Sequence, residues 1–305
     1  MIGIYGANGF IGRHMVERLA GQGRPVRAVS RKFDPEFRAN WETRADLVEA
    51  DFNHSLSMLS TLENVDTVVQ LISSSSPGMG NRLLVEDIQE NVIPHVSFIQ
   101  SAIAKGVKKY IFVSSGGTIY GPDAPVPTPE TAHTNPINSH GMTKLTIEKY
   151  LQMFGRVDGL NYVILRVSNP YGPGQLFRKG QGLIPAVVQR HRDGKPIQII
   201  GDGSAERDYL YIADLVDAVQ AVIDADGIEN EIFNIGSGRG ASVLDVIDGL
   251  EKVMGEPFER EFLPARATDV PKSILDISKA RTALNWSPDT ALADGLKAFW
   301  TSLAP

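Results

Sequence analysis

A histidine and a lysine stand four residues apart in the stretch 139–154, which has the periodicity of an amphipathic helix. This spacing is one helical turn, so the side chains of His140 and Lys144 are expected to share a face. A neutral imidazole, with an ordinary pKa of about 6.5, can accept a proton at pH 7, and a neighbouring ammonium group lowers that pKa. The pair could therefore exchange a proton with a substrate, although Lys144 could also be a surface lysine of an exposed helix.

A glycine-rich turn follows the first apolar run of the chain and opens a helical pattern. Its residues are Gly6, Asn8, Gly9, Phe10, Ile11 and Gly12. Between a strand and a helix, spaced glycines let a pyrophosphate approach backbone N–H groups at the helix N-terminus. We predict a dinucleotide site here, and a tight turn without a ligand is the alternative.

The end of the second predicted strand bears on the choice of cofactor. Ser30, Arg31 and Lys32 stand where a NAD site usually offers a carboxylate to the ribose diol, and a hydroxyl with cationic neighbours suits a 2′-phosphate. We predict NADP or NAD, with NADP favoured, unless Arg31 and Lys32 are ordinary solvated charges. Asp51 is expected to accept a hydrogen bond from the adenine amino group, or to be an exposed aspartate at a strand end.

Short β-type runs alternate with helical patterns through the first half of the chain. Strands are predicted over 25–30, 67–72, 110–114 and 162–167, and helices over 9–21, 81–105 and 139–154. This alternation predicts an α/β fold with a doubly wound, Rossmann-type parallel sheet, to which a helix over 211–224 and a strand over 231–235 return. Turn-rich segments predict a smaller mixed C-terminal substrate lobe. The expected boundaries are 1–168 plus about 210–236 for the dinucleotide-binding domain, and about 169–209 plus 237–305 for the lobe.

The composition excludes several other classes of protein. The chain has 305 residues, 42% of them hydrophobic, which is enough for a large core. A net charge of −6 without a long basic run argues against a nucleic-acid partner. The absence of cysteine excludes disulfides and thiolate chemistry, and the remaining ligand types do not have metal-site spacing. With no signal peptide pattern and no apolar run long enough to span a bilayer, we expect a cytoplasmic protein without a membrane segment.

Ordered motifs along almost the whole chain resemble the extended short-chain dehydrogenase/reductases, and within them the nucleotide-sugar epimerases and dehydratases typified by UDP-glucose 4-epimerase. The motifs are Gly6-x-x-Gly9-x-x-Gly12, Asn91, Ser114-Ser115 ahead of Tyr120-Gly121, Gly141 to Lys144, Arg166 followed by Asn169-Pro170-Tyr171-Gly172, Gly201-Asp202-Gly203, Arg207-Asp208-Tyr209, Asn234-Ile235-Gly236 and Arg266-x-x-Asp269. The resemblance implies a tightly held nicotinamide cofactor that takes a hydride from a sugar carbon, after which the keto intermediate is re-reduced, dehydrated or epimerised.

The resemblance also implies binding residues. Besides the glycine loop and the second strand, the expected cofactor contacts are Asp51, Phe52, Leu71, Ile72, Ser73, Asn91, Lys144 and Asn169. The expected contacts to a nucleotide-sugar, most naturally a UDP-sugar, are Asn169, Arg207, Tyr209, Arg266 and Asp269. The arginines could instead form surface ion pairs with acids such as Glu206 or Asp208, and Tyr209 could pack at the lobe junction. The segment 73–79 is expected to shape hexose selectivity. A homodimer through the helices over 81–105 and 139–154 is also implied.

Two positions depart from the family pattern. His140 stands where the family has its catalytic tyrosine, and Gly116 stands where it has a serine or threonine that shares the sugar-hydroxyl proton. The missing hydroxyl could come from Ser115 or from Thr118, and we favour Thr118, which lies on the same side if the strand end stays extended. Its alternative is a threonine that bonds to the local turn. His140 could be a substitute base, the mark of an impaired site, or the result of a register error.

These observations predict an NAD(P)-dependent nucleotide-sugar epimerase that serves surface polysaccharide or glycoconjugate synthesis. Epimerase is favoured because Gly117 and Thr118 stand where the family's dehydratases carry an Asp-Glu pair. A catalytically impaired protein that binds nucleotide-sugar or dinucleotide is the alternative from another class. A dehydratase or reductase of the same family is the second alternative.

Overall fold

The computed structural model of the protein describes residues 1–75, 84–177, 182–265 and 270–303. The chain divides into two units. The first comprises Met1–Ser115, Asn138–Arg166 and Val219–Phe233, and the second comprises Gly116–Ile137, Val167–Ala218 and Asn234–Pro305. Each unit has a hydrophobic core of its own.

The first unit is built on a seven-stranded sheet with the order β10-β6-β5-β4-β1-β2-β3. The strands are β1 (Ile2–Tyr5), β2 (Val26–Ser30), β3 (Asp46–Glu49), β4 (Thr67–Gln70), β5 (Lys109–Ser115), β6 (Tyr162–Val167) and β10 (Glu231–Ile235). The pairs β1–β2, β2–β3, β1–β4 and β4–β5 are parallel. The doubly wound sheet is thereby confirmed, and the strand predicted over 231–235 returns to this sheet, where it forms the edge.

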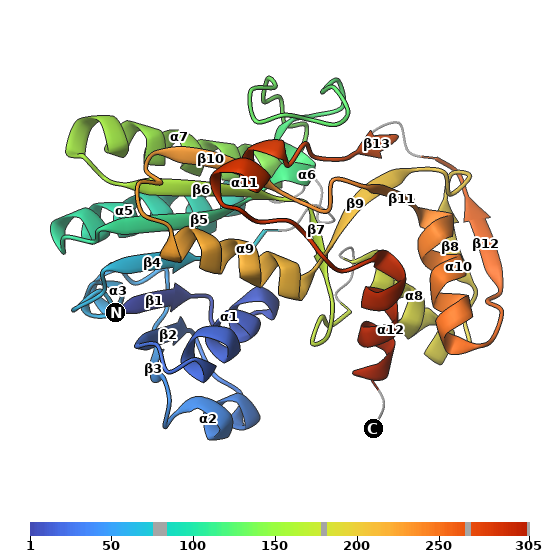
Figure 1. Ribbon diagram of the computed structural model, residues 1–305, viewed down its shortest axis with the longest axis horizontal. Helices are drawn as coiled ribbons and strands as arrows, with labels where there is room; N and C mark the ends of the chain where they lie inside the picture. The colour runs from blue at the N-terminus through green and yellow to red at the C-terminus, as the bar shows by residue number, and fades with distance from the viewer. Residues whose placement is uncertain (76–83, 178–181, 266–269, 304–305) are drawn as a thin grey trace. The chain divides into compact units, whose positions relative to one another are not determined.

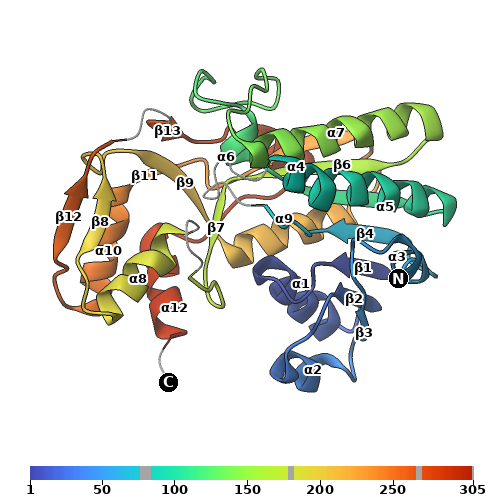
Figure 2. The same ribbon diagram turned by 180° about the vertical axis from the view of Figure 1, so that it is seen from behind.

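Helices cover both faces of this sheet. They are α1 (Phe10–Gly21), α2 (Pro35–Trp41), α3 (Ser55–Ser60), α4 (Leu84–Asp87), the π-helix η2 (Ile88–Val92), α5 (Ile93–Ala104), α7 (Ser139–Asp158) and α9 (Ile212–Asp224). Helix α1 and the part of α9 from Val219 onward, which belongs to the first unit, lie over the face seen in Figure 1, and α5 and α7 lie over the other face, seen in Figure 2. Strand order reverses at β1, whose neighbours are β2 and β4, and ligands bind at such a point in folds of this kind.

The helix expected over 81–105 is helical from Leu84 to Ala104, and residues 81–83 lie outside the described residues. A π-helical turn interrupts it at Ile88–Val92. Pro94 lies at the start of α5, where it has no N–H to give to the preceding turn, so a wider turn accommodates it. Helix α7 begins after Asn138, whose side chain accepts a hydrogen bond from Gly141 N at 2.8 Å, and it runs beyond the predicted end to Asp158.

The second unit is mixed, with short strands and helices. Its strands are β7 (Asn169–Tyr171), β8 (Ile197–Ile200), β9 (Glu206–Tyr211), β11 (Gly240–Ser242), β12 (Arg260–Leu263) and β13 (Lys272–Ser273), and its helices are α6 (Gly116–Ile119), α8 (Leu183–Arg192), α10 (Val243–Met254), α11 (Ser278–Ala283) and α12 (Leu292–Thr301). The fully buried carboxylate of Asp208 accepts hydrogen bonds from Ser237 N and Ser237 Oγ, both at 2.7 Å, and from Gly238 N at 3.2 Å. It thereby fixes the turn that follows β10 against β9.

A buried ion pair joins helix α7 to the sheet in the first unit. Arg166 of β6 donates through Nη2 to Glu148 Oε2 at 2.7 Å, and the two side chains are 3% and 0% exposed. Ser114 Oγ at the end of β5 donates to the other carboxylate oxygen. Because a lone buried charge is strongly unfavourable, each partner depends on the other.

We predict that Arg166→Met lowers the free energy of unfolding by about 3–5 kcal/mol, because Glu148 keeps its buried charge and loses its cation. At pH 9, where Lys144 with its pKa of about 8 is mostly neutral and needs no counter-charge, the double variant Arg166→Met/Glu148→Met should be more stable than the single variant, and urea unfolding measures both. Asp224→Asn, at the partly exposed pair that Arg24 makes with Asp224 (2.6 Å), is the control and should change stability by less than about 1 kcal/mol. Equal losses in the single and double variants would contradict this account of the buried pair.

Candidate active site

The glycine loop between β1 and α1 has the geometry that a pyrophosphate needs. Gly6 has φ +92°, a conformation that favours glycine, and a Cβ at Gly12 would collide with the Gly6 carbonyl oxygen. A Cβ at Gly6 would lie 3.3 Å from atoms of Ile72, so the end of β4 borders the loop. Gly9 caps α1 without a side chain, which leaves the first N–H groups of the helix open to an anion. The loop therefore fits a dinucleotide.

Around the second strand, the structure shows which contacts the candidate cofactor residues make. Ser30 is half-buried at the end of β2, and Arg31 and Lys32 are exposed. Asp51 Oδ1 accepts a hydrogen bond from Asn53 N at 3.0 Å, and Phe52 packs edge-on against His95 in the core. These contacts are compatible with the predicted roles.

Arg13 is a cation near the glycine loop that sequence reasoning did not single out. It donates through Nε to Asn8 O at 3.1 Å and through Nη2 to Asn8 Oδ1 at 2.8 Å, and it forms an ion pair with Asp34. Its position at the fourth residue of α1, one turn after the glycines, is the sequence signal that could have pointed to it.

Asn91 in η2 holds the loop that leaves β4. Its Oδ1 accepts from Ser74 N at 2.9 Å, and its Nδ2 donates to Ser74 Oγ at 2.8 Å and to Asp87 O at 3.2 Å. The side chain is 1% exposed, so these contacts are made in a dry environment where hydrogen bonds are costly to lose. Asn91, which is predicted to contact the cofactor, therefore also fixes Ser74 and with it the segment that contains Ser73. The rest of the predicted selectivity segment, residues 76–79, lies outside the described residues.

His140 is buried on the first turn of α7, where Asn138 caps the helix. Its Nδ1 lies 2.9 Å from Ser75 Oγ. Burial, and secondly the charge of Lys144, lower the pKa of the imidazole to about 3, while a backbone hydrogen bond with Ser75 opposes the shift. The imidazole is therefore neutral at pH 7, which is the form that can accept a proton.

Lys144 lies one turn further along α7 and is 6% exposed. Its Nζ donates to the Val113 carbonyl oxygen at 2.9 Å and lies 4.8 Å from the centre of the Phe112 ring. Burial lowers the pKa of the ammonium group to about 8, and the negative charge of Glu148 opposes that shift. Lys144 is thus a buried cation beside the strand end, and the alternative of an exposed surface lysine is wrong.

The strand end at position 116 differs from the sequence-based expectation. Strand β5 ends at Ser115, and Gly116–Ile119 forms the short helix α6. The expectation that Thr118 lies on the same side as position 116 in an extended strand is therefore wrong, because two residues in a helix are about 200° apart. Ser115 and Thr118 are each half-buried, and their predicted role as hydroxyl partners stays a prediction.

In the second unit, three of the predicted substrate residues lie on adjacent strands. Asn169 pairs with Tyr209 across β7 and β9, and its Nδ2 donates to Asp208 O at 3.0 Å. Arg207 donates through Nη1 to the Glu206 carbonyl oxygen at 2.9 Å.

The acids near Arg207 have other partners. Glu206 forms an ion pair with Lys272 at 2.6 Å, and the Asp208 carboxylate is buried on the Ser237 turn. Tyr209 packs with Tyr171 in the core of the second unit, and burial raises the pKa of its phenol to about 12. Arg266 and Asp269 lie outside the described residues.

Sequence reasoning missed Glu148, and it placed Ser75 in the selectivity segment 73–79 without its contact to His140. Glu148 lies four residues after Lys144, so the spacing that linked His140 to Lys144 could have been extended by one more turn. Ser75 had no such signal, because its approach to His140 joins positions 65 residues apart.

Neither metal nor membrane features are found within the described ranges. Among the residues that the structure describes, no group of three or more His, Cys, Asp or Glu residues could hold a metal ion. Over the same residues, none of the helices has the length and hydropathy needed to cross a membrane.

The fold and the glycine loop define a dinucleotide-binding α/β protein. Residues 2–236 match the model of the NAD dependent epimerase/dehydratase family, and the chain belongs to that family. Curated relatives include the dTDP-4-dehydro-6-deoxyglucose reductase of Escherichia coli, 33% identical over 96% of this chain and 94% of the relative. The UDP-glucose 4-epimerase of Mycolicibacterium smegmatis is 31% identical over 96% and 95%.

Solved structures of this family resemble the whole chain. The UDP-glucose 4-epimerase of Thermotoga maritima, solved with UDP-glucose, has a TM-score of 0.91 and 35% identity over 99% of this chain and 97% of its own. The UDP-glucuronic acid 4-epimerase of Bacillus cereus, solved with UDP-glucuronic acid and NAD, has a TM-score of 0.90 and 26% identity over 99% and 98%. The resemblance drawn from the sequence motifs is confirmed.

Burial of His140 makes a prediction about acid stability. The folded protein binds this proton with a pKa of about 3, whereas an unfolded histidine has a pKa of about 6.5. The unfolded state therefore binds more protons between these values, and stability is lost as the pH falls below about 6.5. We expect wild-type protein to lose about 2 kcal/mol more than His140→Gln between pH 6 and pH 4.5, measured by urea unfolding.

His133→Gln, at an exposed histidine, is the control for that comparison. Its stability should follow the wild-type curve. Parallel curves for wild type and His140→Gln would show that the imidazole of His140 is not held neutral by the fold.

Proposed function

We propose that the chain is an NAD(P)-dependent nucleotide-sugar 4-epimerase, and that its substrate is a UDP-hexose. The observation that carries the proposal is the pairing of His140 with Lys144. The imidazole of His140 and the buried ammonium group of Lys144 are one turn apart on α7, and the charge of Lys144 acts on the imidazole. This arrangement can remove a proton from a sugar hydroxyl and stabilise the oxygen that loses it.

The nicotinamide cofactor, when bound, supplies the acceptor and donor of the hydride. The loop Gly6–Gly12 would hold its pyrophosphate, since its backbone can approach closely and the N–H groups of α1 are open. Asn91 keeps the segment after β4 beside this loop. His140 takes the hydroxyl proton and later returns one to the keto oxygen, and Lys144 supplies a fixed positive charge. Ser115 and Thr118 stay proposed as hydroxyl contacts to the sugar.

Cations are needed locally because a nucleoside diphosphate brings two negative phosphates to a chain with a net charge of −6. We assign this role to Arg207, together with Arg266 by its place in the motif. Asn169, Tyr209 and Asp269 are assigned to the nucleoside and ribose. The functional division into 1–168 plus about 210–236, and about 169–209 plus 237–305, stays part of this proposal.

NADP is the proposed cofactor of choice, although the solved relatives named above include one with NAD. The support is the chemistry of the second strand end, where Ser30 precedes two exposed cations, Arg31 and Lys32. Such a set neutralises a 2′-phosphate and lacks the carboxylate that would repel it.

A nucleotide-sugar reductase is the second candidate. The observation that favours it is the Escherichia coli relative, a dTDP-4-dehydro-6-deoxyglucose reductase, which covers nearly the whole chain at 33% identity. A reductase needs only the second half of the epimerase cycle, in which a proton reaches the keto oxygen. Both functions use a nicotinamide cofactor, a nucleotide-sugar and a proton donor to the keto oxygen, and they differ in whether the keto sugar arrives from outside.

The decisive experiment is an NMR time course with UDP-, GDP- and dTDP-hexoses, each with NAD and with NADP. We expect inversion at C4 of a UDP-hexose, with a higher rate on NADP. His140→Phe should lower kcat by at least about 10²-fold, because the base is removed while an aromatic ring is kept. Consumption of a dTDP-4-keto sugar with NADPH, without inversion of any hexose, would establish the reductase.

His140→Tyr separates a working imidazole from an impaired site. A lower rate than wild type would show that the imidazole is the adapted base. A large gain in rate would show that the present chain is an impaired enzyme. Binding of UDP-sugars without turnover by either form would contradict the proposal and favour a binding protein.

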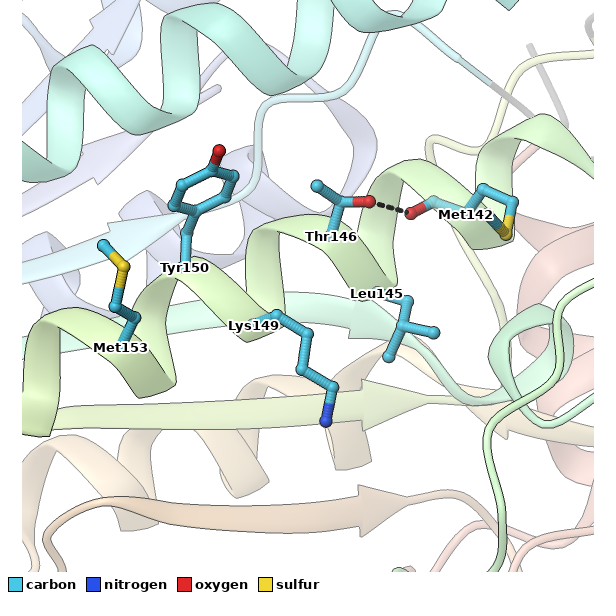
Figure 3. Close-up of a pocket in the computed structure, with 6 residues that line it drawn as sticks. All are labelled: Met142, Leu145, Thr146, Lys149, Tyr150 and Met153. Atoms are coloured by element: carbon cyan, nitrogen blue, oxygen red, sulfur yellow. Dashed lines mark hydrogen bonds between the residues drawn. The ribbon is translucent and has the colours of Figure 1, made fainter.

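We also propose that the protein is a homodimer through α4, η2 and α7. One face of α7 has a shallow apolar hollow, and Figure 3 shows its lining side chains, which are Met142, Leu145, Thr146, Lys149, Tyr150 and Met153. Leu84, Val85 and Ile88 on the neighbouring helices are each more than half exposed. An apolar surface of this kind is typical of an interface.

Val85→Glu/Met153→Glu should convert the dimer to a monomer, because two charges per chain would have to be buried in the interface. Sedimentation velocity measures the change. Phe262→Glu, at an exposed apolar residue of β12, is the matched control and should leave the dimer intact. A wild-type protein that sediments as a monomer at all concentrations would contradict the proposed dimer.

A further inference from the structure

A path of hydroxyl groups leads from the imidazole of His140 to the surface of the first unit. His140 Nδ1 lies 2.9 Å from Ser75 Oγ, and Ser75 Oγ lies 3.4 Å from Ser73 Oγ. His140 and Ser75 are 8% and 7% exposed, whereas Ser73 is exposed to solvent. The path therefore begins at a buried nitrogen and ends at the exposed hydroxyl of Ser73.

The hydrogen bonds along this path have a preferred direction. Ser73 Oγ also donates to the Ser75 carbonyl oxygen, at 3.2 Å. A serine hydroxyl has one proton, so a Ser73 that donates to the carbonyl can only accept from Ser75 Oγ. Ser75 then accepts from His140, whose proton is on Nδ1. With the proton on Nδ1, the lone pair of the neutral ring is on the other nitrogen, Nε2, which is then the basic one.

Asn91 of η2 holds the segment 73–75 in place. Asn91 binds both the backbone N–H and the hydroxyl of Ser74, the residue between the two serines of the path. Ser74 thus uses its own side chain for anchoring, and its neighbours on either side are left to contact each other. Ser74 therefore anchors the segment, Ser75 contacts His140, and Ser73 contacts Ser75.

The electrostatics around His140 make such a path useful. The charged group that acts on the imidazole is Lys144 on the next turn of α7, and no carboxylate opposes it among the causes of the shift. An imidazolium there would be desolvated and repelled. An imidazolium formed when Nε2 takes a proton from a substrate is therefore disfavoured, and release of a proton from the opposite nitrogen restores the neutral ring.

We propose that Ser75 and Ser73 fix the tautomer of His140 and carry its proton to solvent. This inference rests on the proposed function. When Nε2 gains the proton of the sugar hydroxyl, Nδ1 gives its proton to Ser75 Oγ, Ser75 gives its own to Ser73, and Ser73 gives one to water. The ring ends neutral with the proton on Nε2, and one proton has passed from sugar to solvent. The same steps run in reverse when the keto oxygen is re-protonated. Ser75 and Ser73 are positioning residues that act through His140.

The first test uses 15N-histidine-labelled protein without substrate. Two-bond 1H–15N spectra at pH 7 should show His140 as the neutral tautomer protonated on Nδ1. Ser75→Ala should shift it toward the Nε2-protonated tautomer, and Ser75→Thr, which keeps the hydroxyl, should restore the original one. Ser101→Ala, at a serine that bonds within α5 to Ser97 O, is the matched control and should change nothing. A His140 protonated on Nε2 in wild-type protein would overturn the proposal.

The second test follows the proton during a single turnover. With a UDP-hexose in weak buffer, wild-type protein should release about one proton to an indicator dye for each reduced cofactor that forms. Ser75→Ala should lower kcat by about 10²-fold with KM little changed, and proton release should slow in parallel. Ser73→Ala should have a smaller effect, because water can replace an exposed hydroxyl.

These measurements separate the path from the proposed function. Normal turnover and normal proton release in Ser75→Ala would refute the path and leave the epimerase intact. Absence of turnover in wild-type protein would refute the function, while the tautomer of His140 and its response to Ser75→Ala would still decide the hydrogen-bond direction. A solvent isotope effect on kcat that falls in Ser75→Ala would further support proton movement through Ser75.

Discussion

A buried ammonium group determines the electrostatics of the candidate site. Lys144 is almost fully enclosed, and its Nζ has a backbone carbonyl as its hydrogen-bond acceptor. A charge in such surroundings needs a counter-charge, and Glu148 supplies it one turn further along α7. Glu148 is in turn held by Arg166 and Ser114. One turn before Lys144 lies His140, and the charge of Lys144 disfavours a second positive charge on its imidazole.

The replacement of tyrosine by His140 changes what this lysine does. Beside a phenol, a positive charge stabilises the phenolate and so creates a base. Beside an imidazole, the same charge leaves a base that is already neutral but disfavours the cation formed when it accepts a proton. The family arrangement can therefore store the substrate proton on the tyrosine, whereas this chain needs another place for it. We propose that the contact of Ser75 with Nδ1 provides that place.

The sheet topology brings the parts of the first unit together. Strand β4 lies between β1 and β5, so the segment that follows it lies beside the glycine loop and near the strand end that Lys144 contacts. The carboxyl ends of parallel strands meet at one edge, and this is where a doubly wound fold binds its ligand. The π-turn in η2, next to Pro94, places Asn91 under that segment.

The sequence by itself determined the fold class, the glycine loop, the pairing of His140 with Lys144 and the family. These features depend on local spacing, because hydrophobic period and helical periodicity act between residues close in the chain. Only the tertiary structure decided that Lys144 is buried, that residues 116–119 leave the strand as a helix, and that Ser75 contacts His140. Burial and long-range contacts arise when distant segments pack, and no pattern within a single segment contains that information.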